Sequence, residues 1–336
     1  MRKFIPVLIL VIAVIVSCGV KRDAIGEPDE LIVIADSVDW TLIEDQIRNA
    51  FAPEVYTPQD EPWYNIRRVS PKNASNFFNY KNILLVSLLR DGSPSLDLIQ
   101  SLFSDNLVQA MRSGNQPVAL KRNQWREQQL LMILTVPDAP QFSEVLANRD
   151  EELRSYFDEM FVQRQMKYLY DRHEQKKLSR RFQGEYDWKF RVPRDYIVIH
   201  ERPDSNFVWI GRHLPIRWIS VYWEDVDSPV AVDSSVALRL RRTVGQEHYG
   251  NISIDTAYVR TEAAEIDGQH AIRINGIWSH NDDPKGGAFV GFAYYDEFTN
   301  RLFYLDGQIF APGMKKLVFL RRMEIILSTF TTGEKK

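Results

Sequence analysis

The chain has 336 residues, a formal net charge of −3 and an apolar content of 44%. This length allows two domains of ordinary size. The acidic balance excludes a general electrostatic affinity for nucleic acid, which requires basic patches. The only cysteine is Cys18, so the chain forms no internal disulfide and its stability must come from core burial.

The N-terminal stretch has the pattern of an export signal. Arg2 and Lys3 precede an apolar run at residues 4–16, and Ser17 stands before Cys18. The run is shorter than the roughly 20 apolar residues that span a bilayer. Its charge, length and small-residue ending are those of a secretory signal peptide. A plain signal anchor with an incidental cysteine is the alternative.

This stretch resembles the signal of bacterial lipoproteins. The resemblance implies cleavage before Cys18 and attachment of lipid to it, as thioether-linked diacylglycerol with palmitate. More than one acyl chain is needed for stable anchoring. We therefore expect a signal peptide at 1–17, a short tether at 18–30, and a body held at the inner or outer membrane, facing the periplasm or the cell surface.

Residues 31–183 predict an α/β layered domain that ends in a long helix. Thr41 and Glu44 form a potential capping box at the start of a helix. The first strand lacks the glycine pattern that would bring a backbone close to a phosphate. The expected strands are 31–35, 64–69, 82–89, 117–120 and 129–136, and the expected helices are 41–51, 98–111 and 140–182.

The long helix carries acidic residues early and basic residues late, which complements its dipole. Its late basic residues are either a solvated helix end or a contact for anionic lipid headgroups; they are Lys176, Lys177, Arg180 and Arg181.

Residues 184–336 predict a second, antiparallel domain with helices at 232–244 and 315–330. Asp267-Gly268 between two alternating runs indicates a hairpin with a type I′ turn. The expected strands are 196–200, 207–212, 217–223, 258–266, 270–278, 289–295 and 302–310.

Several short segments in a fixed order resemble a Gram-negative lipoprotein family, domain of unknown function 4837, over nearly the whole mature chain. They are 58–62, Asn82-Ile83, Trp125, 276–278, 286–289, Ala311-Pro312, Lys315, Lys316, Arg321 and Glu324. The family implies no activity. More loosely, the element order of the second half resembles the PsbP-like fold, whose members mostly act as binding or assembly factors.

The loop at 278–287 is the most site-like segment. His280 beside Asp282 or Asp283 suggests a general base, and the same acids with Asn281 suggest a calcium site. The composition is equally that of a turn. The candidate ligand loop consists of Trp278, His280, Asp282, Asp283, Gly286 and Gly287.

Gly286 and Gly287 admit two explanations. Either the backbone has positive φ there, or another surface approaches too closely for a Cβ atom. Elsewhere, the histidines show no metal-ligand spacing and no nucleophile elbow occurs, so we expect no metal and no cofactor.

The sequence therefore predicts a lipid-anchored protein of the cell envelope that binds or assembles something. The expected partners are the membrane, through lipid on Cys18, and an envelope protein or a small ligand. The alternative function is that of an envelope hydrolase or transferase that uses the 278–287 loop. Aromatic side chains of the second half line either a core or an apolar pocket.

Overall fold

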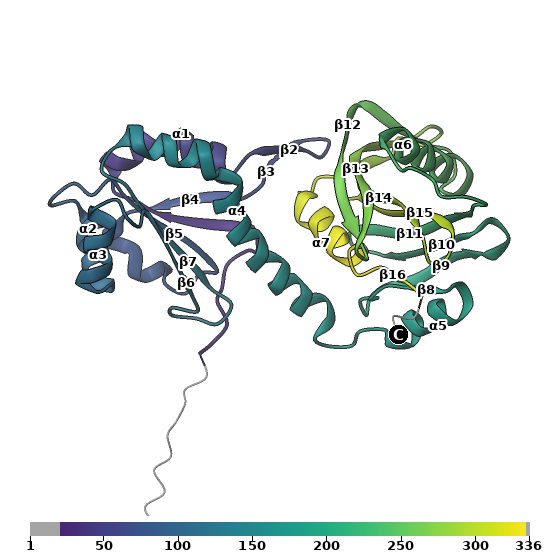
Figure 1. Cartoon of the computed structure of the whole chain (residues 1–336), viewed down its shortest axis with the longest axis horizontal. Coiled ribbons are helices and arrows are strands. Elements are labelled where there is room, and N and C mark those ends of the chain that lie inside the picture. Colours follow the sequence, from purple (N-terminus) through teal and green to yellow (C-terminus); the bar gives the residue numbers. More distant parts are fainter. Residues whose placement is uncertain (1–20, 334–336) are drawn as a thin grey trace, which may run out of the picture.

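The computed structural model describes residues 21–333, which form two halves joined by one long helix (Figure 1). The first half holds a mostly parallel five-stranded sheet, and the second holds an antiparallel seven-stranded sheet. The expected α+β class is confirmed: an α/β layered half precedes an antiparallel sheet flanked by helices. The predicted signal peptide and lipid site Cys18 lie outside the described residues.

The first sheet has the strand order β4-β1-β5-β7-β6, and only β6 runs antiparallel to its neighbour. Every position of β5 and β7 is buried because helices cover both faces, as is usual for parallel strands. The strands are β1 (Glu30–Ile34), β4 (Asn65–Val69), β5 (Asn82–Ser87), β6 (Val118–Arg122) and β7 (Leu130–Thr135).

Two layers of helices enclose this sheet. One layer is α1 (Ser37–Phe51) with the first turns of α4 (Ala139–Tyr170), and both bury apolar residues in a single cluster. The other layer consists of η1 (Pro71–Phe77), α2 (Pro94–Leu102) and α3 (Asp105–Arg112). Alternate residues of each strand belong to opposite clusters, which follows from the two-residue period of a strand.

The first helix starts earlier than the sequence predicts. The Asp36 carboxylate accepts hydrogen bonds from the backbone N–H groups of Val38 and Asp39, so it caps α1. Thr41 lies inside the helix, and Glu44 pairs with Arg48 at 2.6 Å. The predicted capping box is therefore wrong, because an acidic cap one turn upstream already satisfies the free amides.

Two further helices are shorter than predicted. The stretch 98–111 is split at Phe103, where the backbone is extended between α2 and α3. The stretch 140–182 is split into α4 and α5 (Lys176–Tyr186). Phe182 and Tyr186 of α5 pack in the core of the second half. Packing therefore groups α5 with the second half, ahead of the predicted division at residue 184.

A short hairpin occupies residues 54–62, where no strand was predicted. Strands β2 (Glu54–Tyr56) and β3 (Asp60–Pro62) pair only with each other. Figure 1 shows this hairpin extending from the first half toward α7 (Leu317–Leu327) and the second sheet.

The second sheet has the order β12-β13-β14-β15-β11-β10-β9 and is antiparallel throughout. Asp267 and Gly268 have φ of 51° and 81°, as the predicted type I′ turn requires. Its strands are β9 (Ile197–Arg202), β10 (Phe207–Arg212), β11 (Ile216–Asp225), β12 (Ile252–Ile266), β13 (Gln269–His280), β14 (Gly286–Asp296) and β15 (Arg301–Phe310).

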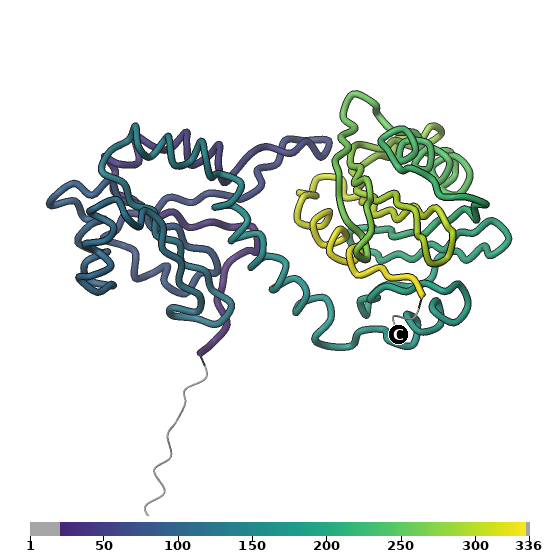
Figure 2. The backbone as a smooth tube through the Cα atoms, viewed as in Figure 1, coloured from purple at the N-terminus to yellow at the C-terminus, as the bar shows by residue number. Residues whose placement is uncertain are grey.

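Helices cover both faces of this sheet too. One face packs against α6 (Ser234–Thr243) and the π-helical turn η3 (Val244–His248). The other packs against α5 and α7. Near the end of the chain, β16 (Thr331–Thr332) returns to pair with β8 (Trp188–Lys189) (Figure 2). The element order compared with the PsbP-like fold is thus present: a strand, a crossing helix, two hairpins and a final helix.

Candidate functional site

The loop between β13 and β14 holds its polar groups against one another. Nδ1 of His280 accepts hydrogen bonds from the backbone N–H groups of Asp282 and Asp283, at 3.1 and 3.2 Å. The Asp283 carboxylate pairs with Lys285 at 2.8 Å, which lowers its pKa, and Asp282 accepts from Asn251 at 3.0 Å. These contacts are those of a turn, and they leave no acid directed at His280 for proton transfer.

The other three residues of the predicted loop site are held in the sheet or its core. Trp278 is 1% exposed and packs in the cluster beneath α6. Neither Gly286 nor Gly287 has positive φ. A Cβ on Gly286 would lie 2.8 Å from the Trp278 carbonyl oxygen, and one on Gly287 would overlap the carbonyl oxygen of Ile309. The close-approach explanation holds, and the approaching surface is the sheet itself.

Two further findings concern the described residues alone. Among residues 21–333, no group of three or more potential metal ligands lies close enough to hold an ion. No helix in that range is long and apolar enough to cross a membrane.

The β2–β3 hairpin fastens the two halves together. The Glu61 carboxylate accepts hydrogen bonds from the backbone N–H groups of Lys316, at 2.7 and 3.0 Å, and Leu317, at 3.0 Å, where α7 begins. An anion there satisfies amides that the helix leaves free and complements its dipole. The segment 58–62 therefore meets Lys316 and the start of α7 at this contact.

Arg321 of α7 is fully engaged at the same contact. Its side chain is 6% exposed and pairs with Asp158 of α4 at 2.7 Å. The guanidinium carbon lies 3.7 Å from the centre of the Phe161 ring and 4.2 Å from that of Trp63. Asp158 also accepts a hydrogen bond from the Trp63 indole at 2.8 Å. A buried cation with these partners is a structural element of the interface.

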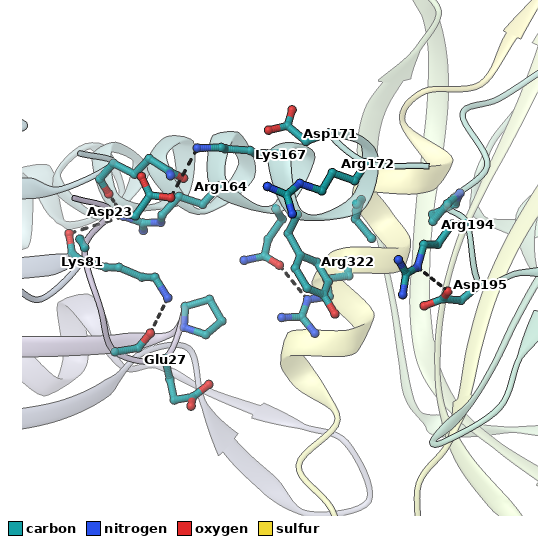
Figure 3. A pocket seen from close by; sticks show the side chains of 18 of the residues that line it. Asp23, Glu27, Lys81, Arg164, Lys167, Asp171, Arg172, Arg194, Asp195 and Arg322 are labelled. Atoms are coloured by element: carbon teal, nitrogen blue, oxygen red, sulfur yellow. Dashed lines mark hydrogen bonds and ion pairs between the residues drawn. The ribbon is translucent and has the colours of Figure 1, made fainter. Parts of the chain in front are cut away.

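Beside this contact, a cavity of about 850 Å³ opens between the two halves; we call it the basic cleft. Figure 3 shows Lys81 and Arg164 of the first half on one side, Arg194 and Asp195 of the second half on the other, and Arg322 between them. The charged residues that line the cleft are Lys81, Arg164, Lys167, Arg172, Arg194, Arg212 and Arg322, with Asp23, Glu27, Asp171 and Asp195.

Positive charge exceeds negative charge in the basic cleft, seven side chains to four. Lys167 pairs with Asp23 at 3.5 Å, while Arg194 and Arg212 share Asp195 at 2.9 and 3.1 Å. Within residues 21–333, the other four cations have no carboxylate partner within 4.0 Å; they are Lys81, Arg164, Arg172 and Arg322. The excess is notable because the chain as a whole is acidic.

Arg164 is the most buried of these four cations, at 5% exposed. Its guanidinium donates only to uncharged oxygens, among them the Gln128 carbonyl at 2.9 Å and Oδ1 of Asn82 at 2.6 Å. Its Nε has no hydrogen-bond partner in the described part of the chain. Because Arg164 is buried and no carboxylate of the described chain pairs with it, its pKa is lowered to about 10. Such a group is stabilised by any anion that reaches it.

Like Arg164, Lys81 and Arg322 donate hydrogen bonds to uncharged oxygens. The Lys81 ammonium donates to the Gly26 carbonyl, and Nε of Arg322 donates to Gln165 at 2.7 Å. Burial lowers the pKa of both side chains, with the Arg164 charge adding to the effect at Lys81. The basic cleft can therefore accept an anion.

Sequence reasoning missed these residues because they are scattered from position 23 to position 322. The basic residues singled out on the long helix lie on α5 and do not line the cleft. The one available signal was the cationic end of α4, where Arg164 and Lys167 lie on the helix and Arg172 lies in the turn that follows it.

Two family models match the chain, one for each half. Residues 24–170 match "Domain of unknown function (DUF8532)", and residues 174–329 match "Domain of unknown function (DUF4837)". The two matches meet at the break between α4 and α5. The expected resemblance along nearly the whole mature chain is therefore narrowed to the second half. Curated proteins gave no match.

Solved structures with detectable similarity are distant. A mutant of the protein Mog1 matches at TM-score 0.32 and 11% identity, over 44% of this chain and 92% of its own. The Saccharomyces cerevisiae Ran-binding protein Mog1p matches at 0.31 and 10%, over 44% and 90%. LpqN, described as involved in cell envelope biogenesis of Mycobacterium tuberculosis, matches at 0.28 and 14%, over 44% and 83%.

These likenesses carry no argument about function. The family match is the firmer finding, because its residues include α6, α7 and all seven strands of the antiparallel sheet. The resemblance to the family described as domain of unknown function DUF4837 is confirmed for residues 174–329.

Proposed function

We propose that this protein is a lipid-anchored protein of the cell envelope that binds an anionic ligand in the basic cleft. The membrane is its first partner, through lipid on Cys18, and the ligand is its second. The observation that carries the proposal is the group of four cations without carboxylate partners in a cavity of about 850 Å³. Cavities of this size hold small ligands.

Binding accounts for the charges better than structure does. Leaving a buried cation without a counter-ion is costly, yet Arg164 is held in that state by Asn82 and by a backbone carbonyl. At Arg321, the same chain supplies a carboxylate where a buried cation serves the fold. Within residues 21–333, four cations of the basic cleft lack such a partner, and this favours a ligand as their counter-ion.

The competing function, a hydrolase or transferase that uses the 278–287 loop, has less support. None of the loop residues lines the basic cleft. The acids nearest His280 are engaged with Asn251 and Lys285. A catalytic base would instead need a free path to a substrate in a cavity.

Anchoring is tested with Cys18→Ser. We expect this variant to be released from membranes or to stay unprocessed, as followed by fractionation and by the mass of the mature chain. Continued cleavage before residue 18 with unchanged membrane retention would refute the anchor.

Ligand binding is tested by calorimetric titration of the full-length lipidated protein in neutral detergent. The probes are citrate, sulfate and pyrophosphate. We expect at least one of them to bind and to bind Arg322→Gln about tenfold more weakly, which corresponds to about 1.4 kcal/mol. This loss is near the low end for a hydrogen bond to a charged group.

Arg239→Gln is the matched control for this titration. It removes the same charge from an ion pair with Glu224 on the far face of the second sheet, where N and O lie 2.7 Å apart. We expect it to bind like the unchanged protein. Equal weakening in both variants, or no binding of any probe by the unchanged protein, overturns the proposal.

A further inference from the structure

We infer that the group bound in the basic cleft is a phosphate, carried either by a membrane lipid headgroup or by a soluble phosphate ester. This inference rests on the proposed function and narrows its ligand from anions in general to one chemical class.

The number and kind of the free cations point to phosphate. Arg164 lies on α4, Arg172 lies in the turn that follows it, and Arg322 lies on α7, so guanidinium groups approach from separate segments. Planar guanidinium groups match phosphate oxygens with paired hydrogen bonds. A phosphate monoester carries about −1.5 to −2 charges near neutral pH. Glu27 and Asp171 also line the cleft, and the cations still outnumber them.

The inner end of the basic cleft is built to hold its cations in place. The Lys81 ammonium is fixed by the Gly26 carbonyl, and the Arg164 guanidinium by Gln128 and Asn82. These two residues are neighbours, because the Arg164 guanidinium also donates to the Lys81 backbone carbonyl at 3.5 Å. Prepositioned donors bind an anion without a further cost in side-chain ordering.

The position of the basic cleft along the chain brings it near the membrane. Asp23 and Ala24 form part of its wall, and Asp23 follows Cys18 by only five residues. Five extended residues span at most about 18 Å. The headgroup layer lies directly above the glycerol to which the lipid on Cys18 would be attached. A headgroup phosphate is therefore within reach of the cleft.

Exposed apolar side chains accompany the basic cleft. Tyr168 lines it and is 60% exposed, and Ile25, between two lining residues, is 49% exposed. Leu214, two residues beyond the lining Arg212, is 90% exposed. Apolar side chains beside cations are the composition of surfaces that bind at the membrane interface.

The test measures how fast phenylglyoxal labels individual arginines in the lipidated full-length protein. The protein is placed in nanodiscs of phosphatidylcholine alone, or in discs that also contain phosphatidic acid. Soluble glycerol 3-phosphate or citrate is added to the neutral discs in separate arms. Mass spectrometry reports labelling at Arg172 and Arg322, with the remote Arg239 as the internal control.

We expect a several-fold fall in labelling of Arg172 and Arg322 with phosphate and none at Arg239. If protection occurs only in the discs that contain phosphatidic acid, the lipid headgroup is the source of the phosphate. Protection by glycerol 3-phosphate in neutral discs identifies a soluble ester. The Lys81→Met variant should lose most of either protection.

Two results would overturn the inference, and they differ in what they leave standing. If citrate protects as well as glycerol 3-phosphate does, the anion site stands and its restriction to phosphate is wrong. If no arm changes labelling at either cleft arginine, the phosphate inference and the proposed function both fail.

Discussion

Arg321 and Arg322 are neighbours on α7, yet they lie in two different regions of the molecule. Arg321 lies in the contact between the halves, where Asp158, Phe161 and Trp63 surround it. Arg322 faces the basic cleft and donates only to the neutral Gln165. One region neutralises its charge internally and the other does not.

This difference separates polar groups that hold the fold from polar groups available to a ligand. Glu61 belongs to the first kind, since it caps α7. So do His280 and Asp283 in the loop between β13 and β14, which bond to their own turn or its neighbours. Lys81 and Arg164 belong to the second kind. In this molecule, a charged side chain is therefore informative about function chiefly where it has no oppositely charged partner.

Substituting the two neighbouring arginines is the sharpest way to break this comparison. Arg321→Met should lower the free energy of unfolding by about 3 kcal/mol, because it leaves Asp158 without its buried partner. Arg322→Met should lower it by about 1 kcal/mol, since it removes one hydrogen bond and the contacts with the Tyr168 and Phe319 rings but leaves no carboxylate unpaired. Urea unfolding followed by tryptophan fluorescence measures both. Equal losses in the two variants would remove the distinction.

Gly287→Ala tests the assignment of the loop after β13 to structure. The added methyl group would overlap the backbone carbonyl of Ile309, so we expect a loss of about 2 kcal/mol from overpacking. Gly184 is the control, because its Cβ position on α5 is open and its φ is ordinary. Gly184→Ala should stabilise by up to about 1 kcal/mol. A Gly287→Ala variant with unchanged thermal unfolding would contradict the steric account.

Glu61→Gln tests whether a charge at the start of α7 matters to the joining of the halves. The amide still accepts a hydrogen bond but loses the attraction between carboxylate and helix dipole, so we expect a loss of about 1 kcal/mol. Glu44→Gln removes an exposed pair with Arg48 and should cost about 0.3 kcal/mol. Anion binding should persist in both variants. If Glu61→Gln abolished binding, cleft and contact would not be separate regions.

The fold was predictable where the signal is local. The strand at β10 was predicted at its observed bounds, and the Asp267-Gly268 turn was recognised from its residue types. The errors arose from caps and breaks. Asp36 caps α1 one turn before Thr41, and Phe103 interrupts a helical spacing that itself continues. The first depends on hydrogen bonds from the Asp36 side chain and the second on an extended backbone at Phe103, and hydrophobic periodicity encodes neither.

The candidate site could not be predicted in the same way. In the sequence, Arg164 and Arg322 are ordinary basic residues of helices, and such residues usually lie on the face that is exposed to solvent. Within the described chain, they are distinguished by their place beside a cavity and by the lack of a carboxylate partner within 4.0 Å, and tertiary packing creates both properties. The 278–287 loop drew attention instead because its titratable residues are adjacent in sequence. In the structure, these adjacent residues form hydrogen bonds and an ion pair with one another.

The smallest expected effect concerns the pH dependence of anion binding, and it sharpens the comparison at Lys81. Burial and the nearby Arg164 lower the pKa of this amine, and Arg322 adds to the effect, while Glu27 and Glu30 oppose it. The charged form is the one that attracts an anion. For an anion whose own charge stays constant, affinity should therefore be full below the lowered pKa of Lys81 and decline as the pH rises through it.

Lys81→Arg provides the test of this pH dependence, because a guanidinium keeps its charge over the range in which the amine loses it. Titrations at rising alkaline pH with sulfate, which stays doubly charged throughout, should show a decline in affinity for the unchanged protein and a nearly flat profile for Lys81→Arg. The ion-paired Lys285, whose partner Asp283 lies outside the basic cleft, supplies the control. Lys285→Arg should keep the original profile. Identical profiles for the unchanged protein and Lys81→Arg would mean that Lys81 does not contact the anion, and that the site consists of the arginines alone.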